Sequence, residues 1–570
     1  MTSRDPDDPE PSDDAPAPVS HLRPVPERFV DAYPDLLHPE AAVNIDAERL
    51  RKMVRLAFEA GDTNHQLAQA LDAAPIAPSS WAEIDCAGEL FLDEFVAQCM
   101  QPQFVGAPES FGRAALVRLL ARPPDDPATM AFRRRVLSSL VDDADLRQRF
   151  ESIYLEIRGL REALESDEPL SEYDSRRRRL GTLAKIHAVI EAMAESFDPA
   201  LEGLGRISAY AQRVQASEAF QRLAQLLAHA RELATVELRV GINAEGLVTE
   251  FEVVKIHEHR QNPFYRAPLV RALQKLRLWI RGYHSSDTVL LAEWFMQVFE
   301  GVEGFVPPLL QLLGAMEFYL AGLAFREACS AKGLRVCFPE FVEGAGDEAS
   351  PRAYGVEQLF NPLLFTQGRR PVTCGLRFDA PVTATIVTGP NSGGKTRLLQ
   401  SLAYVHLLGQ CGLHAPAASA RLRHASALFI SLLERVSVDQ AEGRLGTELL
   451  RIRELFEKAK PGVLVLLDEL CSGTNPQEGE EIFRLVLSLL ERLDARVFVA
   501  THFLSFARAL ASAGSERRSF LQVELGPDRL PTYQFVEGVA GSSLAVQTAQ
   551  RLGVSEAQLR ALVDQRLDEG

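Results

Sequence analysis

The spacing of apolar residues divides the chain into a long helical part and a later part in which strands and helices alternate. From about residue 26 to residue 230, apolar side chains recur every three or four positions, as one face of an amphipathic helix requires. Apolar and polar residues then alternate, which predicts a β-hairpin near 236–260. Helical spacing resumes over 267–332. Beyond a polar, glycine-containing stretch at 338–351, short apolar runs bounded by turns predict an α/β domain with buried parallel strands.

A glycine-rich turn carries the strongest chemical signal of the α/β part. The β-branched run Thr-Ile-Val-Thr at 385–388 leads into Gly-Pro-Asn-Ser-Gly-Gly-Lys-Thr, which fits the pattern G-x-x-x-x-G-K-[ST]. Small residues there let backbone N–H groups surround a phosphate, while Lys395 reaches the β- and γ-phosphate oxygens and Thr396 places a hydroxyl on Mg²⁺. A helix that starts at the turn would present its N-terminus to the phosphates. The residues expected to bind ATP are Gly389, Pro390, Asn391, Ser392, Gly393, Gly394, Lys395, Thr396 and Arg397.

Two further apolar runs end in side chains that suit ATP hydrolysis. The run at 463–467 is followed by Asp468 and Glu469, about seventy residues after the glycine-rich turn. In an ATPase the first acid holds Mg²⁺ together with Thr396, and the second polarises the attacking water. The run at 497–501 ends at His502; a histidine at a strand end is usually structural, but parallel strands bring their carboxyl ends to one edge. We therefore expect Glu469, His502 and Lys395 to be catalytic, and Thr396 and Asp468 to bind the metal.

Composition limits the class of protein. A chain of 570 residues is too long for one core, so two to four domains are expected. The chain has neither an apolar stretch near the roughly eighteen residues of a membrane span nor an apolar run after Met1, so we expect a cytoplasmic protein without membrane contact. Seven cysteines without a C-x-x-C pair argue against a disulfide framework and against a zinc site. We expect them to be reduced and mostly buried.

Charge restricts any nucleic-acid contact to a local patch. The formal net charge is −17, whereas phosphate binding requires positive potential. Residues 1–24 are rich in Asp, Pro, Ser and Ala, which predicts a disordered acidic tail. Four consecutive arginines at 176–179 form the densest basic cluster. They are either a phosphate contact or a solvated helix end, and the second is the commoner role of a charge run.

These motifs together resemble the ATPase domain of the MutS family of DNA mismatch repair proteins. The family patterns T-G-P-N-x-G-G-K-[ST], D-E-[IL]-x-x-G-T and A-T-H are similar to residues 388–396, 468–474 and 500–502. Residues 409–417 resemble the segment G-x-x-V-P-A. Residues 538–549 resemble G-x-x-x-x-S-x-G-[IL]-x-x-A apart from its second glycine, and 112–136 resemble the start of the helical core and lever. The resemblance covers roughly residues 85–570 and is strongest after 350.

The resemblance implies an architecture. It is an α-helical core and lever domain with a small β insertion, followed by an α/β P-loop ATPase domain of the ABC type and by short C-terminal dimerisation helices. The expected segments are a disordered acidic tail at 1–24, an N-terminal helical segment at 25–84, the core and lever domain at 85–345 with its hairpin near 236–260, the ATPase domain at 346–532 and the dimerisation segment at 533–570.

The chain departs from the family pattern at two positions near the expected nucleotide. Family members close two ATPase domains head to tail, which implies a homodimer in which residues 437–450 reach the partner's nucleotide. Gly443 and Arg444 match the usual pair, but the serine expected after them is missing or replaced by Thr447. Pro371 stands where an aromatic residue commonly stacks on adenine.

Two functions from different classes follow from this resemblance. About 85 residues precede the core match, fewer than the family's mismatch-reading and connector domains occupy, and the N-terminal region has no Phe-x-Glu tripeptide to insert at a mismatch. The first hypothesis is an ATPase that hydrolyses ATP at a dimeric composite site to gate a clamp on mismatched or branched double-stranded DNA, in repair or recombination. The alternative is a nucleotide-switched assembly protein whose partner is another protein. A transporter ATPase subunit would need a Leu-Ser-Gly-Gly-Gln signature, which the chain lacks.

Overall fold

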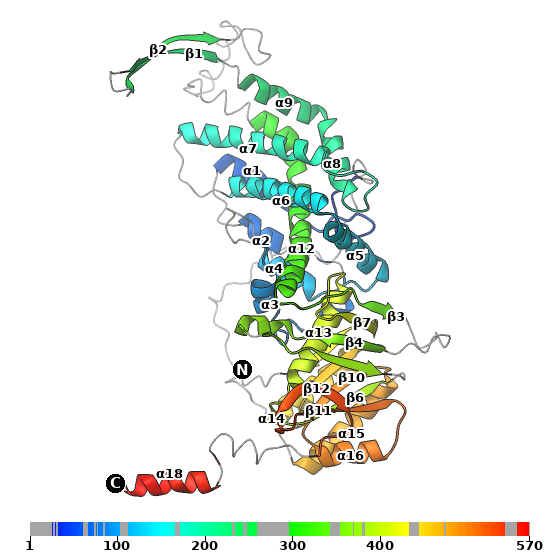
Figure 1. The fold of residues 1–570 in the computed structure, drawn as a ribbon. Helices are drawn as coiled ribbons and strands as arrows, with labels where there is room; N and C mark the ends of the chain where they lie inside the picture. The colour runs from blue at the N-terminus through cyan, green and yellow to red at the C-terminus, as the bar shows by residue number, and fades with distance from the viewer. Residues whose placement is uncertain are drawn as a thin grey trace, which may run out of the picture.

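A helical region is stacked on an α/β region in an elongated molecule (Figure 1). The computed structural model describes residues 32–60, 66–72, 78–83, 86–102, 112–165, 172–230, 234–242, 248–258, 296–342, 354–368, 370–378, 382–432, 444–471, 475–541 and 556–568, with positions 26, 29, 74, 76 and 554. The acidic tail expected at 1–24 and the helical spacing expected over 267–295 lie outside these residues.

The helical region follows the predicted periodicity over most of its length. Its elements are α1 (Ala47–Ala60), α2 (Gln66–Asp72), η2 (Ser80–Glu83), α3 (Leu92–Cys99), α4 (Arg113–Leu120), α5 (Pro127–Asp142), α6 (Ala144–Leu164), α7 (Glu172–Ala194), α8 (Gly205–Gln215), α9 (Glu218–Ala230), η3 (Glu303–Phe305) and α12 (Val306–Ala331). Side-chain caps set two of the helix starts: Asp126 accepts from Thr129 N at 2.6 Å, and Asp143 accepts from Leu146 N at 2.9 Å.

The central helix α12 runs along the helical region, and α1, α3, α4, α5 and α6 pack against it (Figure 1). The helical stretch Met296–Ala331 is long and apolar enough to cross a membrane by length and composition, but 94% of its apolar window is buried inside the protein. A helix that is apolar on nearly all sides is typical of the interior of a large helical domain. We therefore interpret it as a core helix.

The predicted β-hairpin is confirmed at the far end of the helical region. Strand β1 (Ala234–Ile242) pairs antiparallel with β2 (Val248–Glu258). The hairpin projects beyond α9, at the end of the molecule opposite the α/β region (Figure 1).

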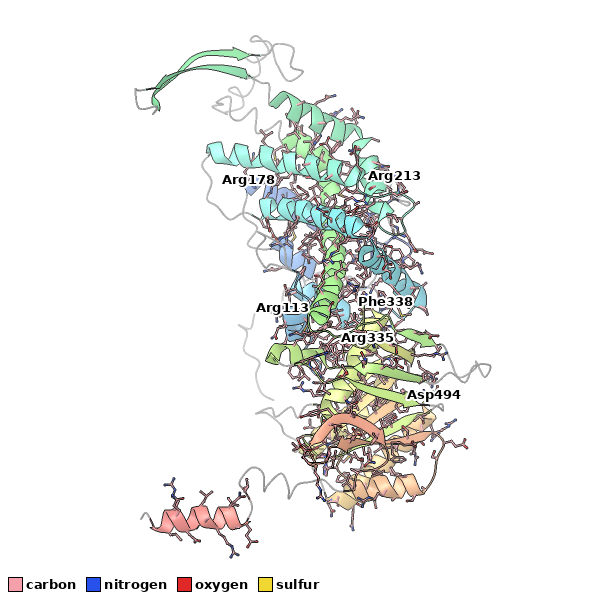
Figure 2. All side chains as sticks on the ribbon, viewed as in Figure 1. Arg113, Arg178, Arg213, Arg335, Phe338 and Asp494 are labelled. Atoms are coloured by element: carbon pink, nitrogen blue, oxygen red, sulfur yellow. The ribbon has the colours of Figure 1, made fainter. Side chains whose placement is uncertain are left out.

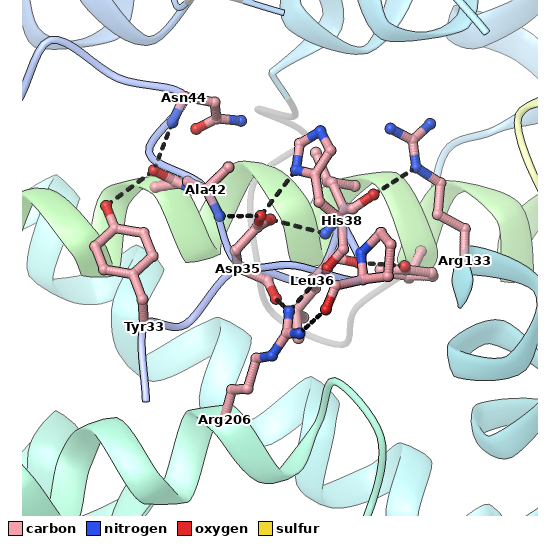
Figure 3. Close-up of polar contacts among 12 residues, drawn as sticks. Tyr33, Asp35, Leu36, His38, Ala42, Asn44, Arg133 and Arg206 are labelled. Atoms are coloured by element: carbon pink, nitrogen blue, oxygen red, sulfur yellow. Dashed lines mark hydrogen bonds and ion pairs between the residues drawn. The ribbon is translucent and has the colours of Figure 1, made fainter. Parts of the chain in front are cut away.

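The segment before α1 is not helical, so the prediction of helix from residue 26 is wrong for residues 33–46. Tertiary hydrogen bonds fix this segment in an irregular conformation (Figure 3). The buried carboxylate of Asp35 accepts from Leu37 N and Ala42 N, both at 2.9 Å, and lies 2.8 Å from His38 Nδ1. Arg206 of α8 donates to the carbonyl groups of Asp35 and His38, at 2.8 Å each. These contacts satisfy backbone groups that a helix would otherwise pair.

The α/β region contains two sheets. The larger has the order β12-β11-β6-β10-β9-β8 and the smaller β3-β7-β4-β5. Their strands are β3 (Glu340–Val342), β4 (Tyr354–Leu359), β5 (Cys374–Phe378), β6 (Ala384–Thr388), β7 (Ser419–Arg423), β8 (Leu428–Ser431), β9 (Leu464–Asp468), β10 (Arg496–Thr501), β11 (Arg518–Leu525) and β12 (Pro531–Glu537). The intervening helices are η4 (Pro362–Gln367), α13 (Lys395–Gln410), α14 (Arg444–Lys458), α15 (Pro476–Arg492) and α16 (Leu504–Ser512).

The parallel arrangement expected for the buried strands is confirmed. Strand β10 lies between β6 and β9 and is parallel to both, and β8 is parallel to β9. Elements of the two sheets lie on both sides of the predicted domain limits, because β3 precedes residue 346 and β12 crosses residue 532.

The helical and α/β regions share one apolar core. It extends from Phe29 through the helices to Leu521 of β11. Two side chains also form hydrogen bonds across the junction: Trp81 Nε1 donates to Ala425 O at 3.3 Å, and the Tyr404 hydroxyl donates to Leu90 O. By contrast, α18 (Glu556–Asp568) lies away from the body of the molecule (Figure 1).

All seven cysteines are free and six of them are buried, as the sequence predicts.

Candidate functional site

The glycine-rich turn joins the central strand β6 to helix α13, as its motif predicts. Gly389 and Gly394 have φ angles of 141° and 86°, in a region that favours glycine. A Cβ atom on Gly389 would lie 2.6 Å from Cγ2 of Val523, so no other residue fits there. The buried Lys395 turns back over the loop, and its Nζ atom donates to Gly389 O at 3.0 Å and to Pro390 O at 3.2 Å.

The structure brings Thr396 and Asp468, the two residues predicted to bind the metal, into direct contact. The Thr396 hydroxyl donates to Asp468 Oδ2. The other carboxylate oxygen, Oδ1, is buried and has no hydrogen-bond partner among the described residues. Burial raises the pKa of Asp468, against the opposing effects of the Thr396 hydrogen bond and of Lys395. Burial likewise lowers the pKa of Lys395, although Asp468 and Glu469 oppose this shift. Neighbouring charges and hydrogen bonds therefore only partly offset the cost of burying the charges of Asp468 and Lys395.

Glu469 and His502 lie side by side at the same sheet edge. Their strands are neighbours, with Ala500 opposite Asp468 in the register. His502 Nδ1 lies 4.0 Å from Glu469 Oε1, and both side chains are about one-third exposed. Glu469 has a φ angle of 54°, a left-handed conformation that is uncommon outside glycine and often found at functional sites. Glu469 is also close enough to the turn to act electrostatically on Lys395.

A cavity of about 580 Å³ adjoins the turn. Asn391, Ser392, Gly394, Lys395, Thr396 and Arg397 line one side of it. Arg397 Nη1 donates to Gln400 Oε1 at 2.8 Å, so its guanidinium is held at the cavity by the first turns of α13. Gly389, Pro390 and Gly393 shape the turn behind this surface. The nine residues predicted to bind nucleotide thus lie together.

Two aromatic residues of this cavity were missed by the sequence reasoning. Tyr533 and Phe535, both on β12, also line the cavity. The exposed Tyr533 has a φ angle of 61°, and its ring lies 3.3 Å from the position of a Cβ atom on Gly394. Pro371 does not line the cavity, although its neighbours Arg370 and Val372 do. The i, i+2 spacing of Tyr533 and Phe535 in a strand was the available signal.

Some of the predicted site segments lie in parts of the chain that the structure does not describe. Residues 433–443, which include Gly443, and residues 472–474 and 542–549 lie outside the described part of the chain. Thr447 lies in the first turn of α14, and its action across a dimer stays a prediction.

The arginine cluster at 176–179 has a structural role where its side chains are described. Arg178 donates to Ala57 O and Phe58 O at 2.9 Å each, and Arg179 donates to Glu59 O at 2.8 Å. These are the last carbonyl groups of α1, which lack partners within the helix. Figure 2 shows Arg178 at α7, well apart from Arg113 and Arg213. The contacts of Arg178 and Arg179 therefore do not support the phosphate-contact interpretation.

Comparison with known proteins gives the same assignment. Residues 385–564 match the family model described as MutS domain V. A protein named Endonuclease MutS2 from Streptococcus mutans is 33% identical over 200 residues, which are 34% of this chain and 25% of that protein. A protein of the same name from Thermomicrobium roseum is 34% identical over 243 residues, which are 41% of this chain and 30% of that protein. The chain thus matches between a quarter and a third of the length of these curated relatives. The turn, the strand that ends in Asp468 and Glu469, and this match agree: the C-terminal part of the chain carries the ATPase domain of the MutS family.

Proposed function

We propose that this protein hydrolyses ATP at a dimeric composite site and uses the nucleotide to gate a clamp on mismatched or branched DNA, in repair or recombination. The observation that carries the proposal is the meeting of Lys395, Thr396, Asp468 and Glu469 at one sheet edge, inside the stretch that matches MutS domain V. The nuclease activity in the names of the relatives is not part of the proposal, because the match covers only 25% and 30% of those proteins.

The residues present fit a magnesium ion bound with ATP. Mg²⁺ prefers oxygen ligands, and the unpartnered Asp468 Oδ1 lies on a carboxylate that already contacts the Thr396 hydroxyl. Thr396 and Asp468 would hold the ion, and the bound ion would neutralise charge on the phosphate oxygens.

The protein's own groups divide the remaining work. Lys395 exchanges its loop carbonyl partners for phosphate oxygens, which relieves the cost of burying its charge. Backbone N–H groups of the glycine-rich turn surround the β-phosphate, with Arg397 at the rim of the same cavity. Glu469 orients and polarises the attacking water, and His502 contacts the γ-phosphate from the neighbouring strand.

Tyr533→Ala is expected to weaken ATP binding by about tenfold, because Tyr533 supplies the aromatic surface for the adenine ring that Pro371 does not provide. Stacking of a base on an aromatic side chain contributes about 1–3 kcal/mol. Titration with a fluorescent ATP analogue measures the effect. Tyr533→Phe keeps the ring and should bind like the unaltered chain; equal loss in both variants would contradict a stacking role.

The proposal includes a homodimer in the cytoplasm. Helix α18 carries exposed apolar side chains at Leu559, Leu562, Val563 and Leu567. Such a stripe on a helix away from the body of the protein supports a dimerisation role. It would bring two ATPase domains together, each with its Thr447 available to the other.

The DNA half of the proposal is tested by measuring DNA affinity and ATP hydrolysis together. Fluorescence anisotropy with homoduplex, mismatched and four-way-junction DNA, each with and without Mg²⁺ and ATP, should show an affinity that ATP changes about fivefold or more for at least one DNA. By reciprocity, that DNA should change the affinity for ATP by the same factor. Hydrolysis that no DNA alters, together with unchanged anisotropy, would favour the alternative of a nucleotide-switched assembly protein.

A further inference from the structure

One buried carboxylate of the helical region holds two parts of the ATPase domain. Glu89 lies in the turn before α3, and its side chain is 0% exposed. Its Oε1 atom accepts from Arg451 Nη2 of α14 at 2.6 Å. Its Oε2 atom accepts from Leu432 N, immediately after β8, at 3.1 Å. Arg451 also donates to Ser431 Oγ at 2.9 Å, so the end of β8, helix α14 and the turn before α3 form one polar cluster.

Helix α14 connects this cluster to the proposed composite site. Thr447 and Arg451 are separated by one helical turn, so both lie on one face of the helix. A shift at the Thr447 end of this rigid element displaces Arg451 as well. The ion pair is buried on the Glu89 side, and breaking a buried ion pair is strongly unfavourable. The arrangement therefore ties the position of α14 to the turn at Glu89.

Helix α3 connects the same cluster to the central helix. Phe95 of α3 contacts Phe325 of α12, with ring centroids 5.5 Å apart and the rings edge to face. Phe95 also contacts Tyr404 of α13, the helix that follows the glycine-rich turn, at 4.7 Å. Contacts from α14 to Glu89, and from α3 to α12, therefore connect the ATPase domain to the central helix of the helical region.

We propose that Glu89 is a positioning residue that couples the nucleotide site to the helical region: α14 does not change position without moving α3 and α12. The inference rests on the proposed function, since it takes ATP as the ligand that displaces α14. Glu89 itself is not among the described residues that line the cavity beside the glycine-rich turn. Its replacement should therefore separate nucleotide binding from the response of the helices.

Hydrogen exchange measured by mass spectrometry on the full chain, with and without Mg²⁺ and ATPγS, tests this coupling. In the unaltered protein the nucleotide should change exchange both at the glycine-rich turn and in peptides of α6 and α12. In Glu89→Gln, ATPγS affinity should stay within about twofold and the turn should respond as before, while the response of α6 and α12 falls by about fivefold or more. Arg451→Gln should reproduce this loss, and the double variant should add little to it because both changes break one link.

Trp81→Phe provides the matched control. It removes a hydrogen bond to Ala425 O at the same junction without touching α14, so the helical response should be retained. If Glu89→Gln does not fold, Arg451→Gln, whose side chain is 24% exposed, carries the test. If the unaltered chain does not bind ATPγS, or if ATPγS does not change hydrogen exchange in α6 and α12, both the proposed function and the coupling are overturned. A helical response retained in both variants, or lost equally in Trp81→Phe, would overturn the role of Glu89 alone.

Discussion

Glu469→Gln is expected to slow ATP hydrolysis by at least about a hundredfold while ATP affinity stays within about twofold, since a positioned general base contributes about 10²–10⁴ in rate. Glutamine keeps the size of the side chain but cannot accept the proton of the attacking water. Glu469 extends from the end of β9 beside His502 and is only one-third exposed, so bulk water does not replace it well. Single-turnover hydrolysis and equilibrium ATP binding, measured on the same preparation, separate the two effects.

Glu524→Gln is the matched control for that measurement. Glu524 lies on β11 of the same sheet, and its carboxylate accepts from the Thr532 hydroxyl at 2.8 Å on the exposed surface. This variant should hydrolyse ATP like the unaltered chain. Full turnover by Glu469→Gln would remove the assigned mechanism, while the fold and the nucleotide site would remain.

Local signals predicted the parts of the site that depend on consecutive residues. The β-branched run before Gly389 and the apolar run before Asp468 are each buried strands, because strand propensity and burial agree there. Their ends meet because parallel strands that share a sheet align their carboxyl ends, which also places His502 beside Glu469. The caps at Asp126 and Asp143 are local in the same sense, since a cap acts within three residues.

Contacts between distant segments could not be predicted in this way. Tyr533 reaches the cavity only because β12 pairs with β11, which in turn pairs with β6. The irregular segment at 33–46 depends on Arg206, which supplies donors from another helix. The arginine cluster at 176–179 left a phosphate contact and a solvated helix end both open, because the sequence does not show that the last turn of α1 lies against Arg178. In each case a partner remote in the sequence determines what the local pattern leaves open.

Lys395→Ala is expected to lower ATP affinity by about a hundredfold or more, because each hydrogen bond to a charged group contributes about 1.5–3 kcal/mol and Lys395 would make at least two to the phosphates. The nucleotide-free fold should tolerate the change. Burial holds the pKa of Lys395 below its value in the unfolded chain, so the charged side chain reduces stability at neutral pH instead of adding to it. Isothermal titration calorimetry with Mg²⁺ and ATP measures the loss of affinity.

Lys395→Met separates the charge from the packing of this side chain. Methionine approximates the buried volume of lysine, so a loss of ATP affinity equal to that of Lys395→Ala would assign the effect to the ammonium group. ATP at a hundred times its dissociation constant stabilises a binding protein by about 2.7 kcal/mol, so the unaltered chain should melt at a higher temperature with Mg²⁺ and ATP. Neither variant should show that rise. Undiminished ATP binding by Lys395→Met would mean that the phosphates do not contact Lys395, and the nucleotide would then have to lie elsewhere on the domain.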